Sequence, residues 1–104
     1  MKTTEHHFEF GREYFFTYEE KPFAYLETDK ELNSHTFASR VLFGQGIEII
    51  NVPDGLIEGM NGATLILREN NCGYHNYLFS DSTDEKIKSE FSRLDKLLRE
   101  AAEW

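Results

Sequence analysis

The sequence predicts an α+β fold in which an antiparallel β-sheet packs against one C-terminal amphipathic helix. Short segments rich in Phe, Tyr, Ile and Thr alternate with Gly, Pro and Asn turns over about residues 6–79, which is typical of antiparallel strands. Apolar residues then recur at steps of three and four over about residues 83–102, which is the period of a helix. A chain of 104 residues suits a single domain, residues 1–104, with one core.

The first three strands are expected at residues 6–10, 13–20 and 23–28. Gly11 separates the first two, and Lys21-Pro22 separates the second from the third, because glycine and proline favour turns. Together they predict an antiparallel meander.

Two hairpins follow the meander. Gly44 and Gly46 supply the positive φ that a bulged hairpin loop requires, and Asn61-Gly62 is the pair typical of a two-residue type I′ turn. The remaining apolar runs lie at residues 35–43, 47–52, 64–69 and 74–79. In all, seven or eight strands are expected, in a sheet that can curl into a barrel.

The C-terminal segment begins with Ser82-Thr83-Asp84-Glu85, which has the S-x-x-E form of a capping box. The apolar residues that share one helical face are Ile87, Phe91, Leu94, Leu98 and Ala101. We expect this face to dock on the sheet.

The charge of the chain excludes some classes of partner. Nineteen acids against eleven Lys and Arg give a net charge of −8, which repels nucleic-acid backbones and anionic membranes. No apolar run reaches the roughly 18–20 residues of a membrane span, and the N-terminus lacks the pattern of a signal peptide. Cys72 is the single cysteine. A cytoplasmic protein with a basic protein partner is therefore expected.

Acids and aromatics concentrate in residues 5–31, which carry eight acids, three bases and eight of the fifteen aromatic residues. Tyrosine is enriched at protein interfaces, and carboxylates steer a basic partner toward them. The residues predicted to contact that partner are Glu13, Tyr14, Phe15, Tyr18, Glu19, Glu20, Tyr25 and Glu27.

An ordinary core strand is the alternative for this stretch. Side chains alternate between the two faces of a strand, so a strand at 13–20 would bury one set and expose the other. The first set is Tyr14, Phe16 and Tyr18, and the second is Glu13, Phe15, Thr17 and Glu19.

The sequence contains no catalytic, metal or cofactor motif. Cys72 and His75 are the one thiol and imidazole that lie close together, but the paired Cys and His spacings of zinc sites are absent. We expect no metal, no cofactor and no enzyme activity, with a small enzyme that uses Cys72 and His75 as an alternative.

In element order, seven strands followed by one C-terminal amphipathic helix, the chain resembles the pleckstrin-homology superfold. Since the N-terminal stretch is acidic, the resemblance implies peptide or protein binding rather than lipid binding. A peptide-binding or scaffold module would use a groove between sheet and helix, next to Phe91 and Leu94.

The leading functional hypothesis is a small acidic inhibitor of the immunity, antitoxin or phage anti-defence type. Such a protein would cover the basic surface of a nuclease or another nucleic-acid-handling protein, with association that weakens as salt is added. The peptide-binding module and the small enzyme are the alternatives, and the sequence leaves open whether the chain is a monomer or a homodimer.

Overall fold

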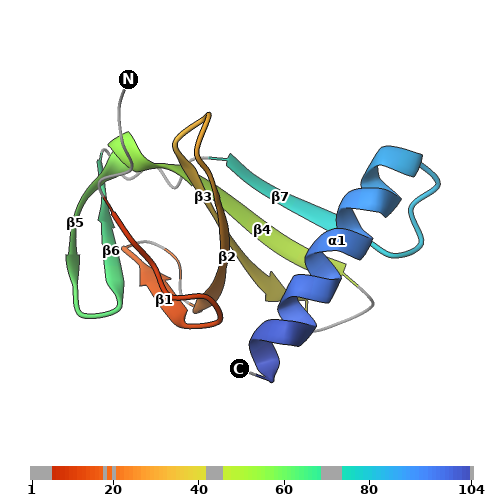
Figure 1. The fold of residues 1–104 in the computed structure, drawn as a ribbon, viewed down its shortest axis with the longest axis horizontal. Coiled ribbons are helices and arrows are strands. Elements are labelled where there is room, and N and C mark those ends of the chain that lie inside the picture. Colours follow the sequence, from red (N-terminus) through yellow and green to blue (C-terminus); the bar gives the residue numbers. More distant parts are fainter. Residues whose placement is uncertain (1–5, 18, 20, 42–45, 69–73, 104) are drawn as a thin grey trace.

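The computed structural model describes residues 6–17, 19, 21–41, 46–68 and 74–103. The elements are β1 (Glu13–Phe16), β2 (Phe23–Asp29), β3 (Ser34–Arg40), β4 (Gly46–Pro53), a 3₁₀ turn η1 (Asp54–Leu56), β5 (Ile57–Asn61), β6 (Thr64–Leu67), β7 (Tyr74–Phe79) and α1 (Glu85–Ala102). The strands form one sheet in the order β5-β6-β1-β2-β3-β4-β7, with α1 lying across one face of it (Figure 1). The predicted α+β class, with a seven-stranded sheet and a C-terminal helix, is confirmed.

The sheet is mixed and open, so two parts of the prediction are wrong. β1 and β6 run parallel, with Phe15 opposite Thr64 and Phe16 opposite Leu65, whereas antiparallel pairing was expected throughout. The edge strands β5 and β7 do not pair, so the sheet does not close into a barrel. A parallel pair joins segments that are distant in the chain, and local periodicity carries no signal for it.

The N-terminal segment contains fewer strand residues than predicted. Residues 6–10 form no strand, and β1 ends at Phe16 because the Glu19 N–H donates to the Phe16 carbonyl at 3.1 Å and turns the chain. Position 11 favours glycine for two reasons. Its φ is +82°, and an added Cβ would lie 3.2 Å from the carbonyl oxygen of Ala101 in α1.

Both faces of strand β4 are covered, which explains why most of its sequence, IEIINV, is apolar. Ile50 and Val52 point to one face of the sheet and Ile47 and Ile49 to the other, and all four are buried. A strand covered on both faces reads as a continuous apolar run rather than as an alternating one.

An aromatic core fills one face of the sheet. Its buried members are Tyr14, Phe16, Phe23, Phe37, Ile50, Val52, Ile57, Leu65 and Leu67, with Phe8 and Tyr25 packed against them. Phe8 comes from the segment that forms no strand, and its ring lies 5.1 Å from the ring of Phe37. Burial of this segment therefore comes from side-chain packing rather than from strand pairing.

A second core, which we call the helix core, fills the opposite face of the sheet. Its buried members are Leu26, Ala38, Ile47, Ile49, Leu78, Leu94, Leu98 and Ala101. The buried members contributed by α1 are Leu94, Leu98 and Ala101, which confirms the predicted apolar stripe. The helix begins two residues later than the capping box implies, because Asp84 and not Ser82 is the N-cap, and it accepts the Lys86 N–H at 2.9 Å.

The β5–β6 turn is also displaced from its predicted position. Asn61 pairs with Thr64, so Gly62 and Ala63 form the two-residue loop, and among the described turn residues here Gly62 has the positive φ. Asn61 stays in the strand, which excludes the expected type I′ turn at Asn61-Gly62.

Candidate functional site

The predicted partner-binding residues do not form one surface. Tyr14 is buried in the aromatic core with 1% exposed, and Tyr25 is half-buried against it. Glu13 and Phe15 point outward from β1, where 41% of Phe15 is exposed. Glu19 lies past the end of β1, 3.8 Å from a ring nitrogen of His75. Tyr18 and Glu20 lie outside the described residues, and a partner-binding role for the whole set stays a prediction.

A β-bulge in β2 separates Glu27 from the rest. Tyr25 lies opposite Phe37, yet Glu27 lies opposite Thr36, because the register shifts by one residue between them. Thr36 and Phe37 point to opposite faces of β3, so Glu27 faces α1 while Tyr25 faces the aromatic core. Without the bulge, Tyr25 and Glu27 would lie on the same face of the sheet, because they are two residues apart.

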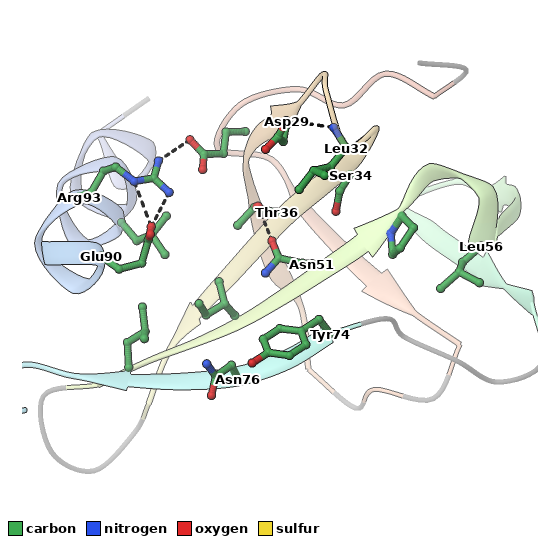
Figure 2. Close-up of a pocket in the computed structure, with 15 residues that line it drawn as sticks. Asp29, Leu32, Ser34, Thr36, Asn51, Leu56, Tyr74, Asn76, Glu90 and Arg93 are labelled. Atoms are coloured by element: carbon green, nitrogen blue, oxygen red, sulfur yellow. Dashed lines mark hydrogen bonds and ion pairs between the residues drawn. The ribbon is translucent and has the colours of Figure 1, made fainter. Parts of the chain in front are cut away.

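A groove lies between α1 and the sheet (Figure 2), and we call it the helix–sheet groove. It has a volume of about 710 Å³. Its lining residues are Glu27, Asp29, Leu32, Ser34, Thr36, Ile49, Asn51, Pro53, Leu56, Tyr74, Asn76, Leu78, Glu90, Arg93 and Leu94. They come from β2, β3, β4, β7 and α1, together with the β2–β3 connection and η1.

Charge on the groove lining is predominantly negative. Glu27, Asp29 and Glu90 stand against Arg93, for a formal charge of −2. Arg93 lies between two of the acids, with its guanidinium 2.6 Å from a Glu27 oxygen and 2.5 Å from a Glu90 oxygen, so it is already paired. These hydrogen bonds raise the pKa of Arg93, and Asp29 is left as an exposed carboxylate at the rim.

Beneath this charged rim lies an apolar floor. Ile49, Leu78 and Leu94 belong to the helix core and also line the groove. Two exposed apolar residues stand at its edge: Leu32 is 75% exposed and Tyr74 is 63% exposed. The groove can therefore take a ligand that combines apolar groups with positive charge.

A second cluster centres on Glu48, a carboxylate that is 5% exposed on the aromatic-core face of β4. Lys21 Nζ lies 2.5 Å from one of its oxygens, and His75 Nε2 lies 2.5 Å from the other. The Tyr77 hydroxyl donates to that second oxygen at 3.3 Å. Burial raises the pKa of Glu48, but hydrogen bonds from Lys21 and His75 outweigh burial and lower it below 4.5.

The Glu48 cluster has the parts of an acid–base site, since a carboxylate that holds one imidazole nitrogen leaves the other free to exchange a proton. In His75 that other nitrogen faces Glu19 at 3.8 Å. Cys72, its proposed partner in the enzyme alternative, lies outside the described residues. These contacts hold the β1–β2 connection, through Lys21 and Glu19, against β4 and β7.

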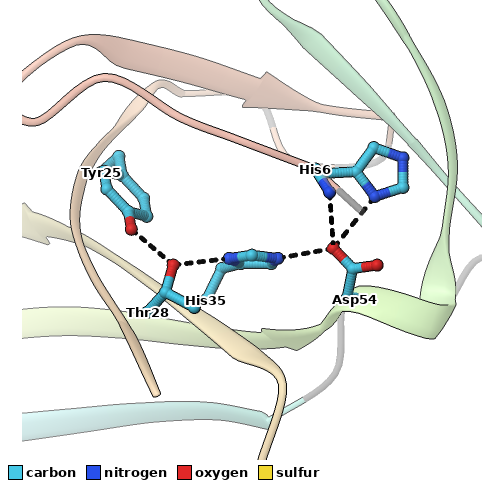
Figure 3. A network of polar contacts seen from close by, with 5 residues as sticks. All are labelled: His6, Tyr25, Thr28, His35 and Asp54. Carbon is cyan, nitrogen blue, oxygen red and sulfur yellow. Dashed lines mark hydrogen bonds and ion pairs between the residues drawn. The ribbon is translucent and has the colours of Figure 1, made fainter. Parts of the chain in front are cut away.

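A buried polar network lies at the other end of the aromatic core (Figure 3). Asp54, 3% exposed, accepts hydrogen bonds at Oδ1 from the His35 ring at 2.7 Å and from the His6 ring at 3.0 Å and backbone at 3.2 Å. Asp54 thereby ties the N-terminal segment to β3, two parts of the chain that make no strand pair.

The hydrogen-bond partners of His35 determine its tautomer. An ionised carboxylate only accepts, so Nε2 of His35 carries the proton and Nδ1 of the neutral ring accepts. The Thr28 hydroxyl donates to Nδ1 at 2.8 Å, and the Tyr25 hydroxyl donates to Thr28 Oγ1 at 2.5 Å. Each polar atom along this chain therefore has a partner, which a fully buried histidine requires.

The pKa values of the buried pair move in one direction. Burial lowers the pKa of His35 below 6.5, and the hydrogen bond to Asp54 offsets burial only in part. Burial raises the pKa of Asp54, but hydrogen bonds from His35 and His6 outweigh it, so the pKa lies below 3.8. The folded chain therefore binds fewer protons at both groups than the unfolded chain does.

We expect the free energy of unfolding to fall on acidification in two stages. Above pH 6.5 the free energy of unfolding has its full value. It falls below pH 6.5, because His35 in the unfolded chain takes up a proton that the folded ring resists. It falls further below pH 4.5, because Glu48 and Asp54 take up protons more readily in the unfolded chain than in the folded chain. Urea titrations across this range measure it. His35→Phe should flatten the first stage, and equal stability of the wild type at pH 6.5 and 4.5 would contradict the assignment.

Sequence reasoning did not single out Glu48, His35 or Asp54. A signal existed for Glu48, which lies in register with the inward-facing Ile50 and Val52 of an apolar strand. No such signal marks Asp54, which reads as an ordinary turn acid in VPDG and is buried because η1 folds over the end of the aromatic core.

No family model, curated protein or solved structure matches this chain. No α-helix in the described part of the chain has the length and apolar character needed to cross a bilayer. Among the described residues, no group of three or more His, Cys, Asp or Glu side chains could hold a metal ion.

Proposed function

We propose that this chain is a small acidic protein that binds a basic segment of a partner protein in the helix–sheet groove and inhibits the partner by covering it. One observation carries the proposal: a groove of about 710 Å³ with an apolar floor and a formal charge of −2. Its volume falls in the range of pockets that hold a drug-sized ligand.

The rim of the groove supplies anchors for such a segment. Tyr74 and Leu32 leave large apolar surfaces in water at the opening, and exposed apolar surface of this kind marks interaction sites. Tyrosine in particular is enriched among interface anchors. Polar contacts come from Ser34, Asn51 and Asn76, whose side chains can hydrogen-bond an extended backbone.

Charge selects the class of partner. The groove carries a formal charge of −2 and the whole chain −8, so a segment with Lys or Arg is attracted at long range and its cation can sit near Asp29. Basic surfaces are what nucleases and other nucleic-acid-handling proteins present to phosphates. A partner of that class, held in the groove, would lose access to its nucleic acid.

The test is a random-peptide display selection on the immobilised protein, followed by titration of a labelled selected peptide. We expect peptides that combine Lys or Arg with aliphatic residues, and binding that weakens as salt is raised. Glu90→Lys should weaken binding about tenfold, which corresponds to about 1.4 kcal/mol, because it reverses a charge on the groove wall.

Glu13→Lys is the matched control, since it makes the same change of charge on the outward face of β1. It should leave the affinity within about twofold once salt screens long-range effects. Selection of neutral or acidic peptides would contradict the proposal. Equal losses in Glu13→Lys and Glu90→Lys would remove the groove as the site.

A further inference from the structure

Strand β7 ends the sheet on one side, and among the described residues it pairs with β4 alone. The Tyr77 N–H points away from β4, because it donates to the Asn76 side chain at 2.8 Å in an exposed contact. In an antiparallel strand the N–H and C=O of one residue point the same way, so His75, Tyr77 and Phe79 direct their backbone groups outward. The oxygen of Asn76 occupies the place that a carbonyl of a neighbouring strand would take.

The two edges of the sheet differ in their protection against pairing. β5 has a bulge between Ile57 and Gly59 and an exposed Glu58, which are features that discourage another strand from adding to an edge. β7 has neither: residues 70–80 contain no Asp, Glu, Lys, Arg or Pro. Although 29% of the residues in the chain are charged, this edge strand has none of the charged residues or prolines that discourage pairing with another strand.

Aromatic rings extend along this edge on the aromatic-core face. The His75 and Tyr77 rings stack with centroids 5.5 Å apart, and the Tyr77 and Phe79 rings with centroids 6.5 Å apart. Tyr77 is 48% exposed and Phe79 is 42% exposed. The row is thus pre-ordered by its own stacking and still open to water on its outer side.

We propose that β7 pairs antiparallel with β7 of a second copy of this chain, which makes a two-fold symmetric dimer with one continuous sheet. Paired residues must share a face of the sheet, so Tyr77 lies opposite Tyr77 of the other copy and His75 lies opposite Phe79. These are the residues whose backbone groups point outward, so the Tyr77 pair exchanges two hydrogen bonds. The Phe79 carbonyl already accepts the Ser82 N–H at 3.3 Å, and it accepts the His75 N–H of the other copy through its second lone pair. Asn76 releases Tyr77 N–H to the other copy.

A second copy fits this edge better than a strand of unrelated sequence. In the stated register every ring of the row meets a ring across the interface, and such cross-strand aromatic pairs stabilise a sheet. Two chains of charge −8 repel each other, and the uncharged segment at residues 70–80 is where they can approach. Glu48, the buried acid beside the row, is already paired with Lys21 and His75.

Sedimentation equilibrium over a range of protein concentrations tests the dimer. We expect the mass to rise with concentration from 12.2 kDa toward twice that value. Tyr77→Lys places two ammonium groups together on the symmetry axis and should hold the chain at 12.2 kDa, with a far-ultraviolet circular dichroism spectrum that shows a folded chain. Met60→Lys puts the same charge on the β5 edge, where the side chain is 38% exposed, and should leave the dimer intact.

Cross-linking provides a second readout that does not depend on a charged variant. The Cα atoms of a hydrogen-bonded antiparallel pair lie about 5.5 Å apart, within the span of a disulfide. In a Cys72→Ser background, Tyr77→Cys should give a covalent dimer under mild oxidation and Met60→Cys should not. A single mass of 12.2 kDa at every concentration, or loss of the dimer in Met60→Lys alone, would overturn the proposal.

Discussion

Phe37→Ala is expected to lower the free energy of unfolding by about 3–5 kcal/mol. Phe37 is 0% exposed, and its ring lies 5.1 Å from those of Phe8 and Phe16 and 5.5 Å from that of Tyr25. Because small domains are stable by about 5–15 kcal/mol, the variant would retain only part of the stability of the wild type. Urea unfolding followed by circular dichroism measures the difference.

Phe15→Ala is the control for this prediction. It removes the same side chain from the outward face of β1, where 41% of the residue is exposed, and it should cost less than about 1 kcal/mol. Comparable losses at the two positions would mean that Phe15 is covered in solution and that the alternation of β1 differs from the one described.

Asp54→Ala is expected to cost about 3 kcal/mol, the second largest effect. The change removes the acceptor of the His35 Nε2–H, and that ring is 0% exposed, so water cannot replace the lost partner. It also releases the His6 ring and backbone, which hold the N-terminal segment over the aromatic core. Urea unfolding at neutral pH gives the cost.

A double-mutant cycle separates the network from simple packing. His35→Phe removes the buried donor, so Asp54→Ala should cost clearly less in that background than in the wild type. Asp29→Ala is the control for losing a carboxylate that accepts backbone N–H groups at an exposed turn, and should cost less than about 1 kcal/mol. Additive losses for His35 and Asp54 would show that they are not coupled.

The groove depends on where α1 lies, and apolar packing sets that position more than the ion pairs do. Arg93 to Glu27 and Arg40 to Asp95 connect α1 to the sheet, but both arginines are half exposed, and such pairs contribute about 0–1 kcal/mol. Leu94 is 1% exposed between α1 and the sheet. Variants at Arg93 can therefore change groove charge with the helix still docked.

The interface proposed from the structure differs from the one expected from the sequence. Sequence reasoning placed it on the acidic and aromatic stretch of β1 and β2, with the groove between sheet and helix as an alternative. Burial of Tyr14 and the bulge after Tyr25 divide that stretch between two faces of the sheet. What remains of the first hypothesis is its charge argument, which now applies to the groove.

Several features of this protein follow from the sequence by itself. The α+β class, the number of strands and the apolar stripe of the helix follow because periods of two and of three to four residues report which side of an element is buried. Net charge follows from counting residues. These properties are local or additive, so no knowledge of neighbours is needed.

The tertiary structure alone decided which residues meet. The parallel pairing of β1 with β6, the turn of Glu27 toward α1 and the contact of His35 with Asp54 each depend on packing between distant segments. A shift of register by one residue exchanges the two faces of a strand, and nothing in a local pattern fixes where a bulge will relieve the strain of packing. The groove exists because both sides of the sheet are used, one by aromatic side chains and the other by α1.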